Sequence, residues 1–259
     1  MTDTLIVTSS IHPVAEARGV RIIEPSARLF QLCCSLISWA DVPEIKNVVL
    51  GDNTKPEYDF QPIRKLMEGK GKKLEVFTFD GDRKKVAEKG KGYGEGEILK
   101  HVFDRSSLIR QSNSFYKVTG RIFVGNFSKL HQKQKNNQRI FDNPIPLHRR
   151  YAKKWAVKWH ADSRHGRGMV RTVFYKCDTG FFSDKLLMRY EQVNDHTHFY
   201  LEHAYFYPLI KYGFSTFKMK PSLVGFSSSS GCLYQEGNDY PEDVKDRATQ
   251  LASEMDIFA

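Results

Sequence analysis

Two short apolar runs near the start of the 259-residue chain each end in side chains that can bind a ligand. The first run ends in the hydroxyls of Thr8, Ser9 and Ser10, and the second ends in Asp52 and Asn53. If both runs are parallel strands, their carboxyl ends lie at one edge of a sheet, which is where open α/β sheets bind ligands. We therefore expect these five residues to line one crevice, together with Asp80 to Asp82 at the end of the third apolar run.

A third apolar run ends in Asp80-Gly81-Asp82, an Asp-x-Asp pattern. Two carboxylates one residue apart can share a hard divalent cation such as Mg²⁺ or Mn²⁺. The same three residues also make an ordinary turn, and they follow an early strand. We therefore expect no bound metal, with a site at Asp80 and Asp82 as the weaker alternative.

Four glycines alternate with other residues at Gly90, Gly92, Gly94 and Gly96. This spacing differs from the G-x-G-x-x-G of dinucleotide sites and from the phosphate loop of ATP-binding proteins, so neither kind of site is predicted. The pattern favours a turn that leads into a helix, whose first backbone amides could approach a ligand. A flexible surface turn is the alternative.

Two cations flank a Thr-Gly pair within the apolar run 114–127. Alternation along a strand puts Lys117, Thr119 and Arg121 on one side. Buried cations need an anion, and a forked arginine beside a lysine suits a diphosphate, whose charge they could neutralise in place of a metal. The alternative is a structural ion pair.

Glu202 lies in an aromatic and apolar segment, residues 198–210. Burial there would raise the pKa of its carboxyl group and make it a candidate general base. It could equally be a helix residue paired with an arginine. Asp195 and Asp178 are the other candidates for the base.

The charge of the chain is concentrated in one stretch. Residues 129–171 hold twelve Lys and Arg against two Asp, a net charge of +10 that equals the net charge of the whole chain. Aromatic residues are interleaved with the cations, so the stretch could contact anionic lipid, nucleic acid or a phosphorylated substrate, or could be a solvated surface. Nucleic acid is not expected, because no helix-turn-helix, zinc-finger or RNP-type signature accompanies the charge.

The elements that must position these residues follow an alternating pattern. Strands are predicted at 4–10, 46–53 and 73–82, with helices between them at about 25–39 and 60–71. This order predicts a mostly parallel sheet flanked by helices. The second half is less regular, with a strand at about 169–176, helices near 182–192 and 197–212, and a terminal amphipathic helix from Pro241.

Composition narrows the class of protein further. The 40% apolar content is enough for a packed core. Four cysteines without a C-x-x-C pair predict reduced thiols rather than a zinc site or disulfides. No apolar run approaches the length of about 18 residues that spans a membrane, and the first ten residues lack the features of a signal peptide. We expect a cytoplasmic protein.

Seven short motifs occur in order along the chain. They are TSS at 8–10, GDN at 51–53, KGYGEGE at 91–97, KVTGR at 117–121, TGFF at 179–182, LEH at 201–203 and GFSSSSG at 225–231. In this order they resemble the pattern of small bacterial glycosyltransferases from lipopolysaccharide and capsule clusters. The stretch between Gly125 and Met169 has no counterpart in that pattern.

The resemblance implies a GT-A-like, Rossmann-type fold that forms a single domain. Residues 1–127 would bind a nucleotide-sugar donor, and residues 128–259 would bind a glycan or lipid-linked glycan acceptor of lipopolysaccharide, O-antigen or capsule synthesis. The residues assigned to the donor are Thr8, Ser9, Ser10, Arg28, Asp52, Asn53, Gly94, Glu95, Lys117, Thr119, Gly120 and Arg121. Glu202, or failing that Asp195 or Asp178, would deprotonate the acceptor.

The basic stretch would then face the acceptor or the inner surface of the cytoplasmic membrane, where the lipid is anionic. The residues assigned to this contact are Arg149, Arg150, Lys153, Lys154, Trp155 and His203. The alternative function is a nucleic-acid-binding or other anion-binding protein that uses residues 129–171.

Overall fold

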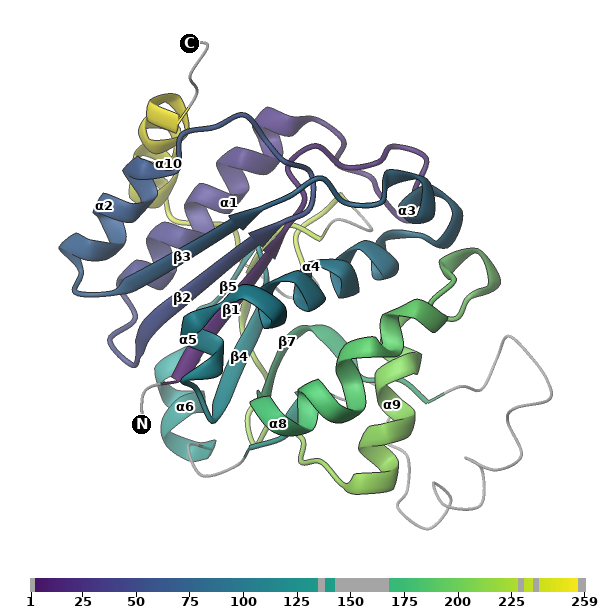
Figure 1. Cartoon of the computed structure of the whole chain (residues 1–259). Coiled ribbons are helices and arrows are strands. Elements are labelled where there is room, and N and C mark those ends of the chain that lie inside the picture. The colour runs from purple at the N-terminus through teal and green to yellow at the C-terminus, as the bar shows by residue number, and fades with distance from the viewer. Residues whose placement is uncertain (1–2, 135–137, 143–167, 228–230, 235–237, 256–259) are drawn as a thin grey trace.

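A six-stranded sheet forms the centre of the computed structural model, which describes residues 3–134, 138–142, 168–227, 231–234 and 238–255. The strand order is β3-β2-β1-β4-β7-β6 (Figure 1). The strands are β1 (Asp3–Ser9), β2 (Ile45–Asp52), β3 (Lys73–Thr78), β4 (Ser114–Thr119), β6 (Ile140–Asp142) and β7 (Arg171–Asp178). The first four are parallel, and β7 and β6 run antiparallel to their neighbours. The predicted mostly parallel sheet is confirmed.

The register of the parallel strands brings their carboxyl ends together. Thr8 of β1 is paired with Gly51 of β2 on one side and with Thr119 of β4 on the other, and Ser9 is paired with Asp52. β1 has an apolar centre, Leu5 to Val7, and is buried from Thr4 to Thr8 because helices cover both of its faces. Its hydroxyl-bearing end therefore lies in the middle of the sheet edge.

Helices pack on both faces of the sheet, over two separate apolar cores (Figure 1). One face carries α1 (Pro25–Ala40), α2 (Gln61–Gly69) and α10 (Glu242–Met255). Pro25 suits the first turn of α1, since proline lacks the amide hydrogen that this position leaves unpaired. The helices predicted after Pro25 and Pro241 are confirmed.

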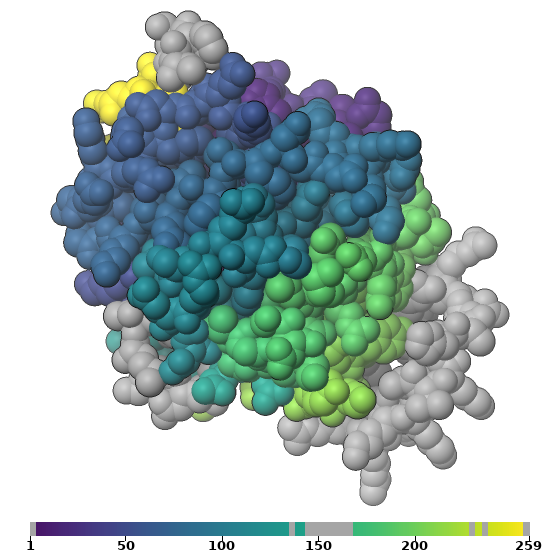
Figure 2. All heavy atoms as spheres, in the orientation of Figure 1, coloured from purple at the N-terminus to yellow at the C-terminus, as the bar shows by residue number. Residues whose placement is uncertain are grey.

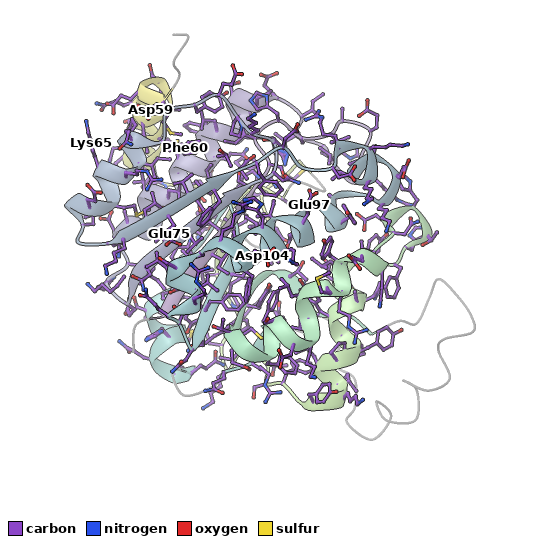
Figure 3. The ribbon with its side chains drawn as sticks, in the orientation of Figure 1. Asp59, Phe60, Lys65, Glu75, Glu97 and Asp104 are labelled. Atoms are coloured by element: carbon purple, nitrogen blue, oxygen red, sulfur yellow. The ribbon has the colours of Figure 1, made fainter. Side chains whose placement is uncertain are left out.

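The other face carries α4 (Lys91–Arg105) and α5 (Ser107–Arg110), together with the segment from η1 (Phe182–Leu186) through η2 (Leu187–Gln192) to α9 (Leu201–Tyr212). From this side that segment, in green, forms a continuous surface with the teal α4–α5 region (Figure 2). Glu75 of β3 accepts hydrogen bonds from the Ser106 and Ser107 hydroxyls, which fixes the corner between α4 and α5 (Figure 3).

The second half of the chain departs from its predicted helices. The segment expected as a helix at 182–192 consists of the π-helix η1 and the 3-10 helix η2, and α9 begins at Leu201 rather than near 197. The remaining short elements are α3 (Arg83–Lys89), α6 (Phe127–Gln134), α8 (Thr179–Phe181), η3 (Asp195–Thr197) and a two-stranded sheet of β5 (Ile122–Val124) with β8 (Leu223–Gly225).

The alternating glycines do not form a turn, so that prediction is wrong. α4 begins at Lys91 and includes Gly92, Gly94 and Gly96. A Cβ atom on Gly96 would lie 2.0 Å from the Cβ of Tyr190 in η2. The glycines allow this helix to pack closely on its neighbours, and that requirement outweighs their poor helix propensity.

The single strand predicted over 114–127 is also wrong, because it is divided at Gly120. β4 ends at Thr119, and β5 pairs with β8 in the second sheet. The amide of Gly120 donates to the carbonyl of Thr8 at 2.8 Å, and a Cβ on Gly120 would lie 2.9 Å from the same oxygen. This close approach of the two backbones leaves no room for a side chain at residue 120. It also ends the alternation of side chains along β4 before Arg121 is reached.

No helix in the described part of the chain is both long enough and apolar enough to cross a membrane.

Candidate active site

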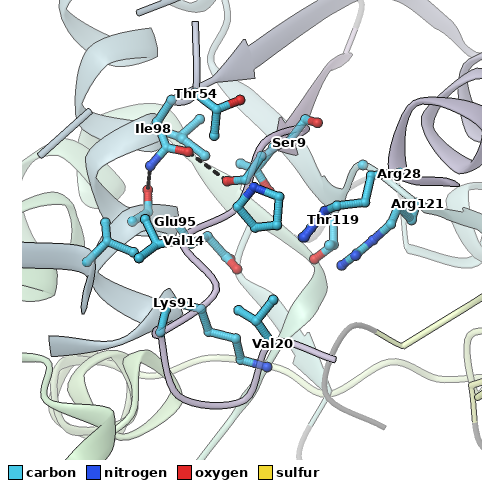
Figure 4. A pocket seen from close by; sticks show the side chains of 18 of the residues that line it. Ser9, Val14, Val20, Arg28, Thr54, Lys91, Glu95, Ile98, Thr119 and Arg121 are labelled. Carbon is cyan, nitrogen blue, oxygen red and sulfur yellow. Dashed lines mark hydrogen bonds between the residues drawn. The ribbon is translucent and has the colours of Figure 1, made fainter. Parts of the chain in front are cut away.

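A pocket opens at the carboxyl edge of the parallel strands, where the switch-point rule predicts a ligand site (Figure 4). Eleven of the residues selected from the sequence line it: Thr8, Ser9, Ser10, Arg28, Asn53, Gly94, Glu95, Thr119, Gly120, Arg121 and Glu202. They come from both ends of the chain, which the sheet and α9 bring together. Asp52, Lys117, Asp178, Asp195 and His203 do not line it.

Asp52 organises the loops at the edge of the pocket. Its side chain is fully buried and accepts hydrogen bonds from the backbone amides of Ile11 at 2.9 Å and Thr54 at 2.8 Å. The adjacent Asn53 does reach the pocket, where its Oδ1 accepts a hydrogen bond of 2.6 Å from the Ser10 hydroxyl. The two neighbouring residues therefore have different roles, since one holds the loops and the other lines the pocket.

Arg28 and Arg121 form what we call the arginine side of the pocket. Both are almost fully buried, at 7% exposure each, and they lie side by side in Figure 4. Arg28 donates to the carbonyl of Ile22, whereas Nη1 of Arg121 has no hydrogen-bond partner among the described residues. Neither guanidinium forms an ion pair with a carboxylate in the part of the chain that the structure describes.

The electrostatics of the arginine side are unfavourable without a ligand. Burial, reinforced by the neighbouring Arg121 charge, lowers the pKa of Arg28 to about 9. Burial likewise lowers the pKa of Arg121 to about 10. The charges of Asp52 on Arg28 and of Glu95 on Arg121 oppose these shifts only in part, and neither carboxylate forms an ion pair with them among the described residues. Two desolvated like charges cost free energy, which an anion bound between them would offset. This arrangement is suited to a phosphate group.

A second part of the pocket, which we call the carboxylate side, consists of Glu95 and Glu202 with their supports Lys117 and Thr172. Lys117 is fully buried and forms an ion pair with Oε1 of Glu95. Its ammonium group also donates to the carbonyl of Thr172 at 2.8 Å and to the Thr119 hydroxyl at 3.3 Å. These contacts show that Lys117, which does not itself line the pocket, supports Glu95, which does.

Glu202 is linked to the same group of residues. The hydroxyl of Thr172 donates to Oε1 of Glu202 at 3.1 Å. Burial raises the pKa of Glu202 above its ordinary value of 4.5, and the nearby Glu95 charge raises it further. A carboxyl group with a raised pKa that lines a pocket is suited to accept a proton from a bound hydroxyl.

The other acidic candidates lie outside the pocket. Asp178 is paired with Ser114 at the opposite edge of the sheet, caps α8 and forms an ion pair with Arg139. Asp195 is buried, and it accepts a hydrogen bond from the amide of Gly92 at 3.1 Å, so it supports the start of α4. Burial raises the pKa of Asp195.

His203 is buried on α9, and its Nδ1 lies 3.1 Å from the carbonyl of Gly168. It follows Glu202 in the sequence, but it does not line the pocket. The basic residues assigned with it to the acceptor or membrane, Arg149, Arg150, Lys153, Lys154 and Trp155, lie outside the described residues.

The Asp-x-Asp pair does not fit a metal site in the described structure. Asp82 caps α3 by accepting from the amide of Lys85 at 3.0 Å, and Asp80 forms an isolated bridge with Thr54. Only the glycine between them, Gly81, lines the pocket. Among the described residues, no cluster of three or more His, Cys, Asp or Glu could hold a metal ion.

Several lining residues were not selected from the sequence. Thr172 lies on β7 and supports Glu202, and Lys91 begins α4. Pro13, Val14, Ala17 and Val20 form an apolar part of the lining. Lys91 could have been found as the first residue of the KGYGEGE motif. Thr172 has no local signal, because its position depends on the antiparallel pairing of β7 with β4.

No protein-family model matches the chain, and no curated protein matches its sequence. Solved structures do match its fold. The galactosyltransferase LgtC, solved with donor and acceptor sugar analogs, aligns with a TM-score of 0.55 and 8% identity over 99% of this chain and 97% of LgtC.

Two further glycosyltransferases match with a TM-score of 0.51. GlyE from Streptococcus pneumoniae TIGR4 is 12% identical, over 84% of this chain and 45% of GlyE. The bifunctional enzyme WbbM is 9% identical, over 98% of this chain and 50% of WbbM. This chain thus spans about half the length of these two proteins and nearly all of LgtC. At such low identity the likeness concerns the fold, and the predicted GT-A-like α/β fold is confirmed.

Proposed function

We propose that this chain is a glycosyltransferase that moves a sugar from a nucleotide-sugar donor to a glycan acceptor. The observation that carries the proposal is the arginine side, where two buried guanidiniums without a carboxylate partner face a pocket at the carboxyl edge of the sheet. A diphosphate would supply the missing anion. The glycosyltransferase-like fold supports the same function.

The nucleoside and diphosphate would occupy separate parts of the pocket. Ser9, Ser10 and Asn53 present hydroxyl and amide groups for the nucleoside. Arg28 and Arg121 would bind the diphosphate and meet the negative charge that develops on it as the sugar leaves. Preorganised positive charge at a leaving group lowers the barrier most when it is fixed and desolvated beforehand, as both guanidiniums are.

Glu202 is our candidate for the general base. In a direct displacement its carboxylate takes the proton from an acceptor hydroxyl, and the hydroxyl oxygen forms the new bond to the anomeric carbon. The bond between that carbon and the diphosphate breaks, and the nucleoside diphosphate leaves with both electrons. The raised pKa of Glu202 favours this role, provided that the pH is high enough to ionise it.

The finer assignments rest on the sequence. Residues 1–127 would bind the donor and residues 128–259 the acceptor, within one catalytic domain. The seven ordered motifs favour a bacterial glycan of lipopolysaccharide, O-antigen or capsule synthesis. The charge of residues 129–171 favours a lipid-linked acceptor or a peripheral contact with the cytoplasmic membrane. No step of the mechanism is assigned to Mg²⁺ or Mn²⁺, because Asp80 and Asp82 do not fit such a site.

The proposal is tested by a thermal-shift screen with UDP-, GDP-, CMP- and dTDP-sugars and the free nucleotides. We expect at least one donor to raise the melting temperature, since a ligand that binds the folded state stabilises it by mass action. We also expect that donor to be hydrolysed slowly, with water as acceptor, and hydrolysis to persist in EDTA. Stabilisation by polynucleotides but by no nucleotide would favour the nucleic-acid alternative and overturn the proposal.

A pair of matched variants tests whether the donor binds in the pocket or elsewhere on the protein. Arg121→Gln should abolish the stabilisation by the donor, because it removes one of the two buried cations. Arg139→Gln should preserve it, because Arg139 pairs with Asp178 at the far edge of the sheet. Equal loss in both variants would show that the donor does not bind at the arginine side.

A further inference from the structure

Lys117 has no proton left for a ligand. An ammonium group carries three N–H donors. Those of Lys117 are directed at three protein acceptors, which are Glu95 Oε1, the Thr119 hydroxyl and the Thr172 carbonyl. The side chain is also fully buried, so a phosphate could not approach it. Lys117 is therefore a positioning residue, and the part of the site that it positions is Glu95.

Glu95 has one oxygen held in place and one available to a ligand. Oε1 forms the ion pair with Lys117, whereas no hydrogen bond reaches Oε2 within the described part of the chain. The side chain is 22% exposed and lines the pocket. The backbone on either side cannot shift easily, since Gly94 packs against Asn53 and Gly96 against Tyr190. Glu95 is thus a rigid acceptor for a hydrogen-bond donor.

The acceptor groups of the pocket are separated from its main donor groups. Arg28 and Arg121 lie together, and Glu95 lies apart from them in Figure 4. Glu202, the second carboxyl group, is linked to the Glu95–Lys117 pair through Thr172. A ligand that matches this arrangement is anionic at one end and donates hydrogen bonds at the other. A sugar with free hydroxyls, joined to a diphosphate, has that distribution of groups.

We propose that Oε2 of Glu95 accepts a hydrogen bond from a hydroxyl of the transferred sugar, and that the pocket selects an uncharged sugar over a uronic acid. This inference rests on the proposed function and identifies the class of donor. A neutral sugar presents hydroxyl donors to the carboxylate side. The carboxylate of a uronic acid offers acceptors alone at neutral pH, and its charge would be repelled by Glu95.

Besides the arginine side, the cations that line the pocket and could oppose this selection are Lys91 and Arg83. Arg83 is exposed and donates a hydrogen bond to the carbonyl of His12. The charge of Lys91 lowers the pKa of both Glu202 and Asp195, so it already compensates two acidic groups of this chain. A uronic acid that reached Lys91 would compete with those groups for it. Preferential binding of a uronic acid would therefore overturn the proposal directly.

The test compares nucleotide sugars that differ in the oxidation of one carbon. Calorimetry on the whole chain would use UDP, UDP-glucose and UDP-glucuronate, and in parallel GDP, GDP-mannose and GDP-mannuronate. We expect the neutral sugar to bind about tenfold or more tightly than its uronate, as for a hydrogen bond to a charged group. Equal affinities, or tighter binding of the uronate, would overturn the inference.

Glu95→Gln supplies the second measurement. The carboxamide keeps an oxygen for Lys117 but removes the charge. We expect the variant to lose most of the preference for the neutral sugar while binding the free nucleoside diphosphate with unchanged affinity. Glu88→Gln, at an exposed glutamate of α3, is the matched control and should behave as the parent.

The outcomes distinguish the inference from the function on which it rests. If neither nucleoside diphosphate nor any nucleotide sugar binds, the proposed function is wrong. If the free diphosphates bind but Glu95→Gln leaves the preference unchanged, Glu95 does not contact the sugar and the inference is wrong. If Glu95→Gln fails to fold, the comparison of neutral and acidic sugars on the parent chain still decides the question.

Discussion

The two sides of the pocket treat their buried cations in opposite ways. On the carboxylate side, Lys117 is surrounded by three acceptors and has a counter-ion in Glu95. On the arginine side, four residues further along the chain, Arg121 is buried with a second guanidinium beside it, and its Nη1 has no hydrogen-bond partner within the described part of the chain. A buried cation whose N–H donors are all hydrogen-bonded within the protein stabilises the fold. A buried cation with an unbonded N–H donor can form that bond with a ligand.

The difference arises at Gly120. If the strand had continued, Lys117 and Arg121 would project from the same face and share one environment. The chain instead ends β4 at Thr119, and Arg121 enters the second sheet region, where its carbonyl accepts a hydrogen bond of 3.0 Å from Tyr240. One turn thus divides a motif that looks continuous in sequence into a supporting residue and a ligand-facing residue.

The largest effect is expected at Glu202, which tests whether the carboxylate side takes part in the chemistry. Glu202→Gln should lower turnover by about 10²–10⁴-fold, the usual contribution of a general base. In the parent, a base is active when deprotonated, so activity should rise with pH through a pKa above 4.5. Measured pH–rate profiles should show this acid limb, and a profile unchanged by the substitution would remove Glu202 from the mechanism.

The titration of Glu202 should also make the free energy of unfolding depend on pH. A carboxyl group whose pKa is raised by folding binds its proton more tightly in the folded state. The free energy of unfolding should therefore fall as pH rises from about 4.5 through the raised pKa. Glu202→Gln should reduce this fall, as measured by urea unfolding at several pH values.

Lys117→Met should have the next largest effect, which is a decrease in the free energy of unfolding. It leaves Glu95 without its buried partner, which costs about 3–5 kcal/mol when such a pair is broken. Urea unfolding would measure the loss. Adding Glu95→Gln to the same chain should restore part of it. A Lys117→Met protein as stable as the parent would contradict the supporting role that distinguishes Lys117 from Arg121.

Arg121→Gln should show the reverse pattern, with a loss of activity and little loss of stability. Turnover should fall by about 10²–10³-fold, by analogy with the loss of one donor to a developing negative charge. The free energy of unfolding should not decrease, because the guanidinium has no ion pair to lose among the described residues. Unfolding of this variant under conditions where the parent is folded would show that Arg121 is structural after all.

Thr172→Val should have the smallest effect of these substitutions. It tests how the carboxylate side sets the pKa of Glu202. It removes the hydroxyl that donates to Glu202, while its carbonyl still accepts from Lys117. Because that hydroxyl lowers the pKa of Glu202, the acid limb of the pH–rate profile should move to higher pH. The stability cost should be about 1 kcal/mol. An unshifted acid limb would mean that Glu202 does not titrate in that limb.

Much of the fold could be predicted from local patterns. Three of its features are each visible in a short window of sequence. They are the β-branched residues in 4–10, Pro25 at the start of α1 and the strand–helix alternation up to β3. The placement of Asn53 in the pocket also follows, since carboxyl ends of parallel strands must share one edge. These predictions depend on periodicity and connection rules rather than on contacts between distant residues.

The structural role of the alternating glycines in α4 could not be predicted from the neighbouring sequence. Their composition indicates a turn, and only the position of Tyr190, almost a hundred residues away, makes small residues necessary inside α4. The acidic candidates pose the same problem. The aromatic and apolar neighbours of Glu202 favour it over Asp178 as a base, but they do not place Glu202 in the pocket and Asp178 at the far edge of the sheet. Those places depend on the antiparallel direction of β7 and on α9.

By itself the sequence determined the parallel half of the sheet, the edge at which a ligand site forms and the residue types that gather there. The tertiary structure decided which of those residues have unsatisfied groups. The polar groups of Asp52 and Lys117 are bonded within the protein, whereas Nη1 of Arg121 and Oε2 of Glu95 have no hydrogen-bond partner among the described residues. The physical reason is that satisfaction of a buried polar group is a property of all the atoms around it, and most of those atoms come from distant parts of the chain.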